Sequence, residues 1–232
     1  ARVRHFSAIG VPGTAAGYKT SIIRVTPQAG QNLTSVDITT PHTGAVPAST
    51  KWLDIELRCP RAVDLILGDG TALKPLVQRI LVREHNTTTF DSDFGRCAQL
   101  RSVPLFDTQN VTLMQSLFMD STALTAVPLF DTQNVTGMTN MFFNASALAS
   151  VPLFNTQKVT AMNNMFRGAR ALTTVPLFDT RNVADMRGMF QDASSLTSVP
   201  LFDTGNVVLM SFMLRATNVA SVPLFNTVKV TN

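Results

Sequence analysis

The hexapeptide Val-Pro-Leu-Phe-Asp/Asn-Thr returns at nearly constant spacing through the second half of the chain. Its copies begin at Val103, Val127, Val151, Val175, Val199 and Val222. Four intervals are 24 residues long and the last is 23. A period of this size is typical of stacked units, each of which needs its neighbours to bury an apolar face. We therefore predict a solenoid with five full repeats over 103–221 and a half repeat over 222–232.

The repeat 127–150 predicts a short strand, a turn, a short helix and a second turn. Val127 and Leu129 alternate as they would in a strand. The apolar residues from Val135 to Phe142 are spaced as on one face of about two helical turns. The predicted fold is an α/β solenoid, a right-handed strand–helix coil with one parallel sheet.

Five positions of the hexapeptide never change, and we interpret the phenylalanine and threonine columns as structural. One predicts an internal aromatic stack of Phe106, Phe130, Phe154, Phe178, Phe202 and Phe225. The other predicts a hydroxyl ladder of Thr108, Thr132, Thr156, Thr180, Thr204 and Thr227. The proline in every copy removes a backbone donor, so we place it at the margin of a short strand.

The full frame V-P-L-F-D-T-x-N-V-T-x-M-x-x-M-F-x-x-A-x-x-L resembles the BspA-like leucine-rich repeats of bacterial surface proteins. Similar repeats occur in mycoplasma-type lipoproteins and in phage structural proteins, and the resemblance covers about 79–232. Many members of that family carry cysteine after the Met-Phe pair. This chain has Cys97 there in its first copy only, followed by Ser121, Ala145, Ala169, Ala193 and Ala216.

The region before the repeats predicts a small β-rich, sandwich-like anchoring domain over 1–78. Its β-branched or alternating runs are Lys19–Thr26, Leu33–Thr40, Trp52–Arg58 and Ala62–Leu67. The stretch 79–102 is a degenerate capping repeat, because Phe90 and Phe94 fall 48 positions before Met138 and Phe142. Its polar residues fit the exposed end of a stack: Arg79, Arg83, Glu84, His85, Asp91 and Asp93.

Charge and composition argue against nucleic-acid partners and against insertion into a membrane. The net charge of +4 arises in 1–84, which hold ten Lys/Arg and six Asp/Glu, and no basic cluster is present. No apolar run is long enough to span a membrane. The residues from Ala1 to Phe6 lack the apolar core of a secretory signal, so we expect a signal removed earlier or export that uses none.

No pattern in the sequence predicts catalysis, a cofactor or a metal. His5, His42 and His85 are far apart, and we expect Cys59 and Cys97 to remain thiols. The Asp/Asn position of the hexapeptide could form a calcium ladder, but Asn at two copies favours ordinary turn chemistry. We therefore expect a protein that is not an enzyme.

Two sets of residues are candidates for contacts with partners. Variable polar positions on a rigid frame suit a recognition surface, although an unconstrained surface would look the same: Gln109, Gln133, Gln157, Arg181, Asn140, Asn164 and Arg187. The half repeat lacks its helix, and the interval around Met210–Met213 is one residue short. We expect a second copy or another virion protein to cover this end, a frayed end being the alternative: Leu224, Phe225, Val228 and Val230.

The predicted function is that of a non-enzymatic virion surface or structural protein, either a capsid decoration or a tail adhesin. The β-rich domain would anchor it, and the solenoid would be displayed for assembly or for binding a host-surface glycan or protein. The alternative is a secreted or cell-surface bacterial adhesin of the BspA-like class.

Overall fold

The computed structural model describes the strands of the N-terminal region, residues 85–91 and residues 94–231. The strands are β1 (Val11–Pro12), β2 (Lys19–Thr20), β3 (Ser35–Asp37), β4 (Asp54–Arg58), β5 (Asp64–Ile66) and β6 (Arg79–Arg83). They form three two-stranded sheets: β1 pairs with β2 antiparallel, while β3–β5 and β4–β6 are parallel. Four of these strands, β2 to β5, lie inside the four predicted runs. The sandwich-like packing involves residues outside the described ones and stays a prediction.

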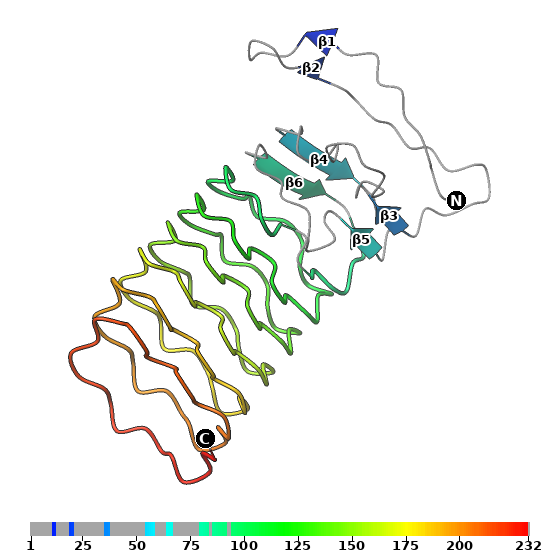
Figure 1. The fold of residues 1–232 in the computed structure, drawn as a ribbon. Coiled ribbons are helices and arrows are strands. Elements are labelled where there is room, and N and C mark those ends of the chain that lie inside the picture. The colour runs from blue at the N-terminus through cyan, green and yellow to red at the C-terminus, as the bar shows by residue number, and fades with distance from the viewer. Residues whose placement is uncertain are drawn as a thin grey trace, which may run out of the picture.

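From residue 85 the chain winds into a stack of coils, each one circuit of the repeat, that runs to residue 231 (Figure 1). One residue per coil forms a parallel β-bridge to the next coil. The bridged residues are Thr89, Leu113, Gly137, Ala161, Asp185 and Leu209. The predicted solenoid is thus confirmed, and the stretch around Thr89 forms its first coil. The handedness of the coil stays a prediction.

The predicted helix is wrong, because the backbone from Met138 to Ala145 forms turns that bond partly to the next coil. Met141 and Ala145 donate their N–H groups three residues back, to the carbonyls of Met138 and Phe142. Other N–H groups of the segment donate instead to carbonyls 23 residues ahead, in the next coil. They belong to Met138, Asn140, Phe142 and Asn144. An α-helix would keep these donors inside the segment. Alternate N–H groups therefore hold neighbouring coils together.

Left-handed residues interrupt the same segment twice in each coil. Asn140 has φ of 56° and Asn144 has φ of 55°. Right-handed helices exclude such values, which asparagine and glycine tolerate better than other residues. Equivalent residues in other coils share the conformation: Arg96, Ser116, Asp120, Asn164, Gly168, Gly188, Asp192, Phe212 and Ala216. Two successive turns therefore produce the same 3–4 spacing of inward-facing apolar side chains as a helix would. No helix is present among the described residues.

The predicted strand at the hexapeptide is also wrong. The N–H of Phe130 donates to the carbonyl of Pro128 at 3.0 Å, which closes a three-residue turn around Leu129. The same bond forms in every later copy, at Phe154, Phe178, Phe202 and Phe225. Proline has no N–H to donate to a neighbouring coil, so the chain turns here instead of extending. Val127 and Phe130 point inward, while Leu129 is exposed.

The core contains two parallel columns of phenylalanine rings. The predicted stack is confirmed: Phe154, Phe178 and Phe202 lie 6.5 Å apart between ring centroids, with planes within 6°. A second column, formed by Phe94, Phe118, Phe142, Phe166 and Phe190, was absent from the prediction of an internal stack. Its centroids are 5.5–5.7 Å apart along the central coils. Valine, methionine and leucine columns fill the remaining interior.

The threonine ladder is confirmed by five hydrogen bonds between coils. The Thr132 hydroxyl donates to the carbonyl of Asn155 at 2.8 Å, and the hydroxyls of Thr108, Thr156, Thr180 and Thr204 do the same one coil apart. Each of these threonines is buried. The threonine hydroxyls therefore satisfy backbone carbonyls beside the hexapeptide turn, where proline prevents backbone hydrogen bonds between coils.

The missing residue of the last interval is not where the sequence suggested. Phe190 and Asp192 donate to the carbonyls of Met213 and Arg215, in the register that earlier coils use. The spacing is therefore unchanged through 210–213, and the shorter connection follows Arg215.

A pair of adjacent substitutions tests the inward and outward assignments. Phe154→Ala should lower the free energy of unfolding by about 3–5 kcal/mol, because it removes one buried ring from the stack. Leu153→Ala, at the exposed neighbour, should change it by less than about 0.5 kcal/mol. Urea unfolding followed by circular dichroism measures both. Equal effects at the two positions would contradict the assignment.

Candidate interaction surface

Six leucines form an exposed apolar column along the solenoid, which we call the leucine stripe. Leu129, Leu153 and Leu177 each have 59% of their surface exposed, and Leu224 has 96%. The stripe consists of Leu105, Leu129, Leu153, Leu177, Leu201 and Leu224. The alternation of Val127 and Leu129 predicts that both side chains lie on one face of a strand. That prediction is wrong, because the turn at Pro-Leu-Phe places the leucine at its apex, exposed, while Val127 is buried. Single exposed leucines are ordinary, but a contiguous apolar patch is typical of an interaction site.

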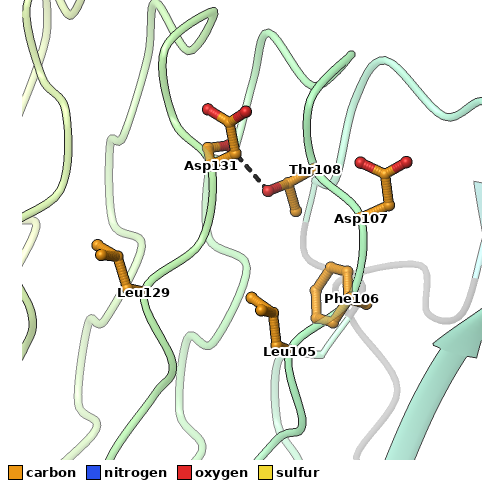
Figure 2. A pocket seen from close by; sticks show the side chains of 6 residues that line it. All are labelled: Leu105, Phe106, Asp107, Thr108, Leu129 and Asp131. Atoms are coloured by element: carbon orange, nitrogen blue, oxygen red, sulfur yellow. Dashed lines mark hydrogen bonds between the residues drawn. The ribbon is translucent and has the colours of Figure 1, made fainter.

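Acidic and amide side chains line one side of the leucine stripe. Leu105 and Leu129 lie at equivalent places on adjacent coils, with Asp107 and Asp131 beyond them (Figure 2). Together with Phe106 and Thr108 they line a shallow depression of about 420 Å³. We call this side the Asp/Asn column, formed by Asp107, Asp131, Asn155, Asp179, Asp203 and Asn226.

A small, exposed residue lies three positions before the leucine of each coil. Five of these six residues carry a hydroxyl, and the sixth is alanine. We call them the Ser/Thr column, formed by Ser102, Ala126, Ser150, Thr174, Ser198 and Ser221. The surface therefore has an apolar centre, with carboxylates on one side and hydroxyls on the other.

The Asp/Asn column serves turn geometry in every coil. Oδ1 of Asp131 accepts the N–H of Gln133 at 3.1 Å, and Oδ1 of Asn155 accepts that of Gln157 at 3.1 Å. An asparagine oxygen does this as well as a carboxylate, which explains why both residues occur. Among the described residues, no group of three His, Cys, Asp or Glu is placed to hold a metal ion.

The predicted recognition residues separate into two structural groups. Gln109, Gln133, Gln157 and Arg181 follow the Asp/Asn column and are exposed. Arg181 also contacts Asp179 through Nε, at 2.9 Å.

The remaining predicted residues have local structural roles. Asn140 and Asn164 occupy left-handed positions, so asparagine at these sites is explained by the positive φ of the backbone. Arg187 binds Asp185 in its own turn at 2.7 Å, and this hydrogen bond raises the pKa of Arg187. These three side chains are separated along the coil from the glutamine positions, beyond the buried Val135 or its equivalents.

The predicted assembly residues differ strongly in exposure. Leu224 and Val228 are exposed, whereas Phe225 is half-buried and stacks on Phe202 at 6.5 Å. Val230 is half-buried. Leu224 is also the last member of the leucine stripe, so its exposure belongs to a feature shared by all six copies. Contact at this end stays a prediction.

One buried histidine lies at the start of the stack. His85 packs edge-on against Phe90, with centroids 5.3 Å apart, and its Nδ1 accepts the N–H of Thr87 at 3.2 Å. Its Nε2 is buried without a hydrogen-bond partner. Burial lowers the pKa of His85 below the ordinary 6.5, partly offset by the backbone and charge of Asp107. Of the two cysteines, Cys97 is a buried thiol, and Cys59 lies outside the described residues.

One family comparison covers nearly all of the solenoid. DUF285, described as a Mycoplasma protein of unknown function, matches residues 88–198 and 149–232, which together exceed half of the chain. The chain belongs to the DUF285 family. The matched residues begin within the first coil, so what this DUF285 protein shares with its family is the repeat stack.

The remaining comparisons add little about function. No curated protein matches this DUF285 protein. A leucine-rich repeat protein from Eubacterium ventriosum resembles it with a TM-score of 0.43 and 13% identity, over 74% of this chain and 60% of the other. The chain thus spans about 60% of that protein's length. Neither description mentions a virus, so the expected virion role gains no support.

In the described part of the DUF285 protein, no helix has the length and apolar character needed to span a bilayer.

The left-handed position of Asn140 gives a testable prediction. Asn140→Val should cost about 1–2 kcal/mol of stability, because a β-branched side chain is strained at positive φ. Asn140→Gly should be neutral to within about 0.5 kcal/mol, since glycine adopts this conformation freely. Gln133→Val in the same coil is the control and should be tolerated. Thermal and urea unfolding of the three variants would show the difference; equal stability of Asn140→Val and Asn140→Gly would contradict it.

His85 predicts a pH-dependent stability. Unfolded His85 takes up a proton near its ordinary pKa of 6.5, above the lowered pKa of the folded state. The free energy of unfolding should therefore fall as pH decreases below about 6.5, until the folded pKa is reached. His85→Phe preserves the ring contact with Phe90 and should lose less stability between pH 7.5 and 5. Urea midpoints at both pH values provide the measurement. An identical pH dependence in the two proteins would rule out this role for His85.

Proposed function

We propose that this DUF285 protein is a non-enzymatic bacterial cell-surface protein whose solenoid presents a binding surface to other proteins. The proposal takes the bacterial alternative in preference to the virion role, because the family is described from Mycoplasma. The single observation that carries it is the leucine stripe. Its six side chains project at equivalent positions of successive coils. They stay exposed within the monomer, so their apolar surface can be removed from water only by contact with a partner.

Apolar surface of this kind favours a protein partner. Exposed apolar patches rimmed by polar residues are characteristic of protein–protein or membrane contacts. The Asp/Asn column beside the stripe is unfavourable for the anionic surface of a membrane. Its carboxylates can instead accept hydrogen bonds from a polypeptide at the rim.

The stack supports the surface mechanically. Each coil bonds to the next through backbone groups, the Thr ladder and two ring columns, so neighbouring leucines keep a fixed separation. A preformed surface loses little conformational entropy on binding. Rigid presentation of repeated side chains suits recognition and requires no catalytic group.

Labelling of intact cells tests the proposed location. A membrane-impermeant amine reagent should modify Lys158, which is exposed, on intact cells that make the protein. A cytoplasmic protein analysed in the same sample is the control and should be labelled only after lysis. Peptide mass spectrometry identifies the modified lysine.

Adhesion measured with the same cells tests the binding role. Leu153→Lys with Leu177→Lys should reduce attachment to protein-coated surfaces or host cells, whereas Gln133→Lys with Gln157→Lys should not. Labelling of Lys158 only after lysis would refute the location. A reproducible enzymatic turnover that persists through repurification would refute the non-catalytic assignment.

A further inference from the structure

We infer that two copies of this chain associate through the leucine stripe, side by side and parallel, with Leu153 of each copy facing Leu153 of the other. The inference rests on the proposed binding role of the stripe and names its partner. Four properties of the surface support it: apolar content, extent, spacing and charge.

The apolar content is sufficient for a reversible contact. Fully burying a leucine gains about 1.5–3 kcal/mol, so the twelve mostly exposed leucines of a pair offer on the order of 12–20 kcal/mol. Association costs about 4–15 kcal/mol in lost rigid-body freedom. The stripe alone therefore supports a weak dimer, and the flanking columns would have to contribute the rest.

The extent of the surface fits one partner of the same size. The leucine stripe, the prolines beside it, the Asp/Asn column and the Ser/Thr column each contain six residues, which makes 24 on one copy. Stable interfaces use about 20–30 residues on each side. Full coverage therefore requires a partner that extends along all six copies of the hexapeptide.

The spacing of the coils restricts that partner further. Rings of Phe154 and Phe178 are nearly parallel and occupy equivalent places, so their 6.5 Å separation measures the distance between coils beside the stripe. A second copy repeats with the same interval and can match every leucine. An extended strand, with alternate side chains about 6.6–6.8 Å apart, would match the leucines but would leave the flanking columns uncovered.

Charge decides between the two ways of pairing the surfaces. In an antiparallel pair, the two-fold axis crosses the stripe and the two Asp/Asn columns face each other, so carboxylates such as Asp131 and Asp203 would meet like charge. In a parallel pair, the axis follows the solenoid, and each Asp/Asn column faces the Ser/Thr column of the other copy. Hydroxyls there, such as Thr174 and Ser198, can donate to the carboxylates of the matching coils, Asp179 and Asp203. The parallel pair avoids repulsion and gains hydrogen bonds.

The oligomeric state of the full chain tests the contact. Sedimentation equilibrium should show a dimer with a Kd on the order of micromolar. Leu129→Lys with Leu153→Lys should raise that Kd at least about 100-fold, because two like charges enter each apolar surface. Gln133→Lys with Gln157→Lys adds the same charge in the same coils and should leave dimerisation unchanged. At protein concentrations below the Kd, all three proteins should unfold at the same urea concentration, since every substituted side chain is exposed.

Cross-linking tests the orientation in a Cys59→Ser background. Leu153→Cys should form a disulfide-linked dimer with itself, while Gln157→Cys should not. Cross-linking that requires a mixture of Leu129→Cys and Leu201→Cys chains would reveal an antiparallel pair and overturn the inference.

A wild-type chain that remains monomeric at about 100 times the expected Kd would also overturn it. So would equal weakening by the leucine and glutamine variants. If the monomeric chain still attaches to cells and loses attachment with the leucine substitutions, the proposed binding function stands and only the partner is wrong.

Discussion

The division of backbone N–H groups between a coil and its neighbour is the constraint on which the rest of the structure depends. Along Met138–Ala145, alternate donors close turns within the coil, and the others reach carbonyls of the next coil. This division is possible only because Asn140 and Asn144 adopt left-handed conformations that reverse the chain direction twice. It keeps equivalent residues stacked over one another, and the two phenylalanine columns follow from that register.

The proline of the hexapeptide connects the fold to the proposed function. Without an N–H it cannot join a ladder between coils, so the chain closes a three-residue turn and places Leu129 and its equivalents outside. Two residues after the turn, the Thr132 hydroxyl donates a hydrogen bond to the carbonyl of Asn155 and so connects the two coils. The three-residue turn, which forms because proline has no N–H to donate, thus generates the leucine stripe. The same turn positions the Asp/Asn column beside the stripe.

Several residues that vary between repeats are explained by local geometry. Asn164 and Gly188 share a left-handed position, and Asn155 substitutes for aspartate because either side chain caps the turn. Arg187 pairs with Asp185. Variation at these positions therefore carries less information about a partner than the constancy of the exposed leucines does. Constancy at an exposed apolar position has no explanation in the stability of the monomer.

The sequence by itself determined the solenoid, its register and the inward direction of Phe154, because exact recurrence requires equivalent environments and apolar rings must be buried. It also revealed the degenerate first copy around Phe90. The tertiary structure decided the rest. Apolar spacing alone cannot distinguish a helix from paired turns, since both direct Met138 and Phe142 inward; only the bonds to the next coil favour the turns. Alternation likewise predicted Leu129 on the same face as Val127, whereas the proline turn, which forms within a stack of coils, places Leu129 in solvent.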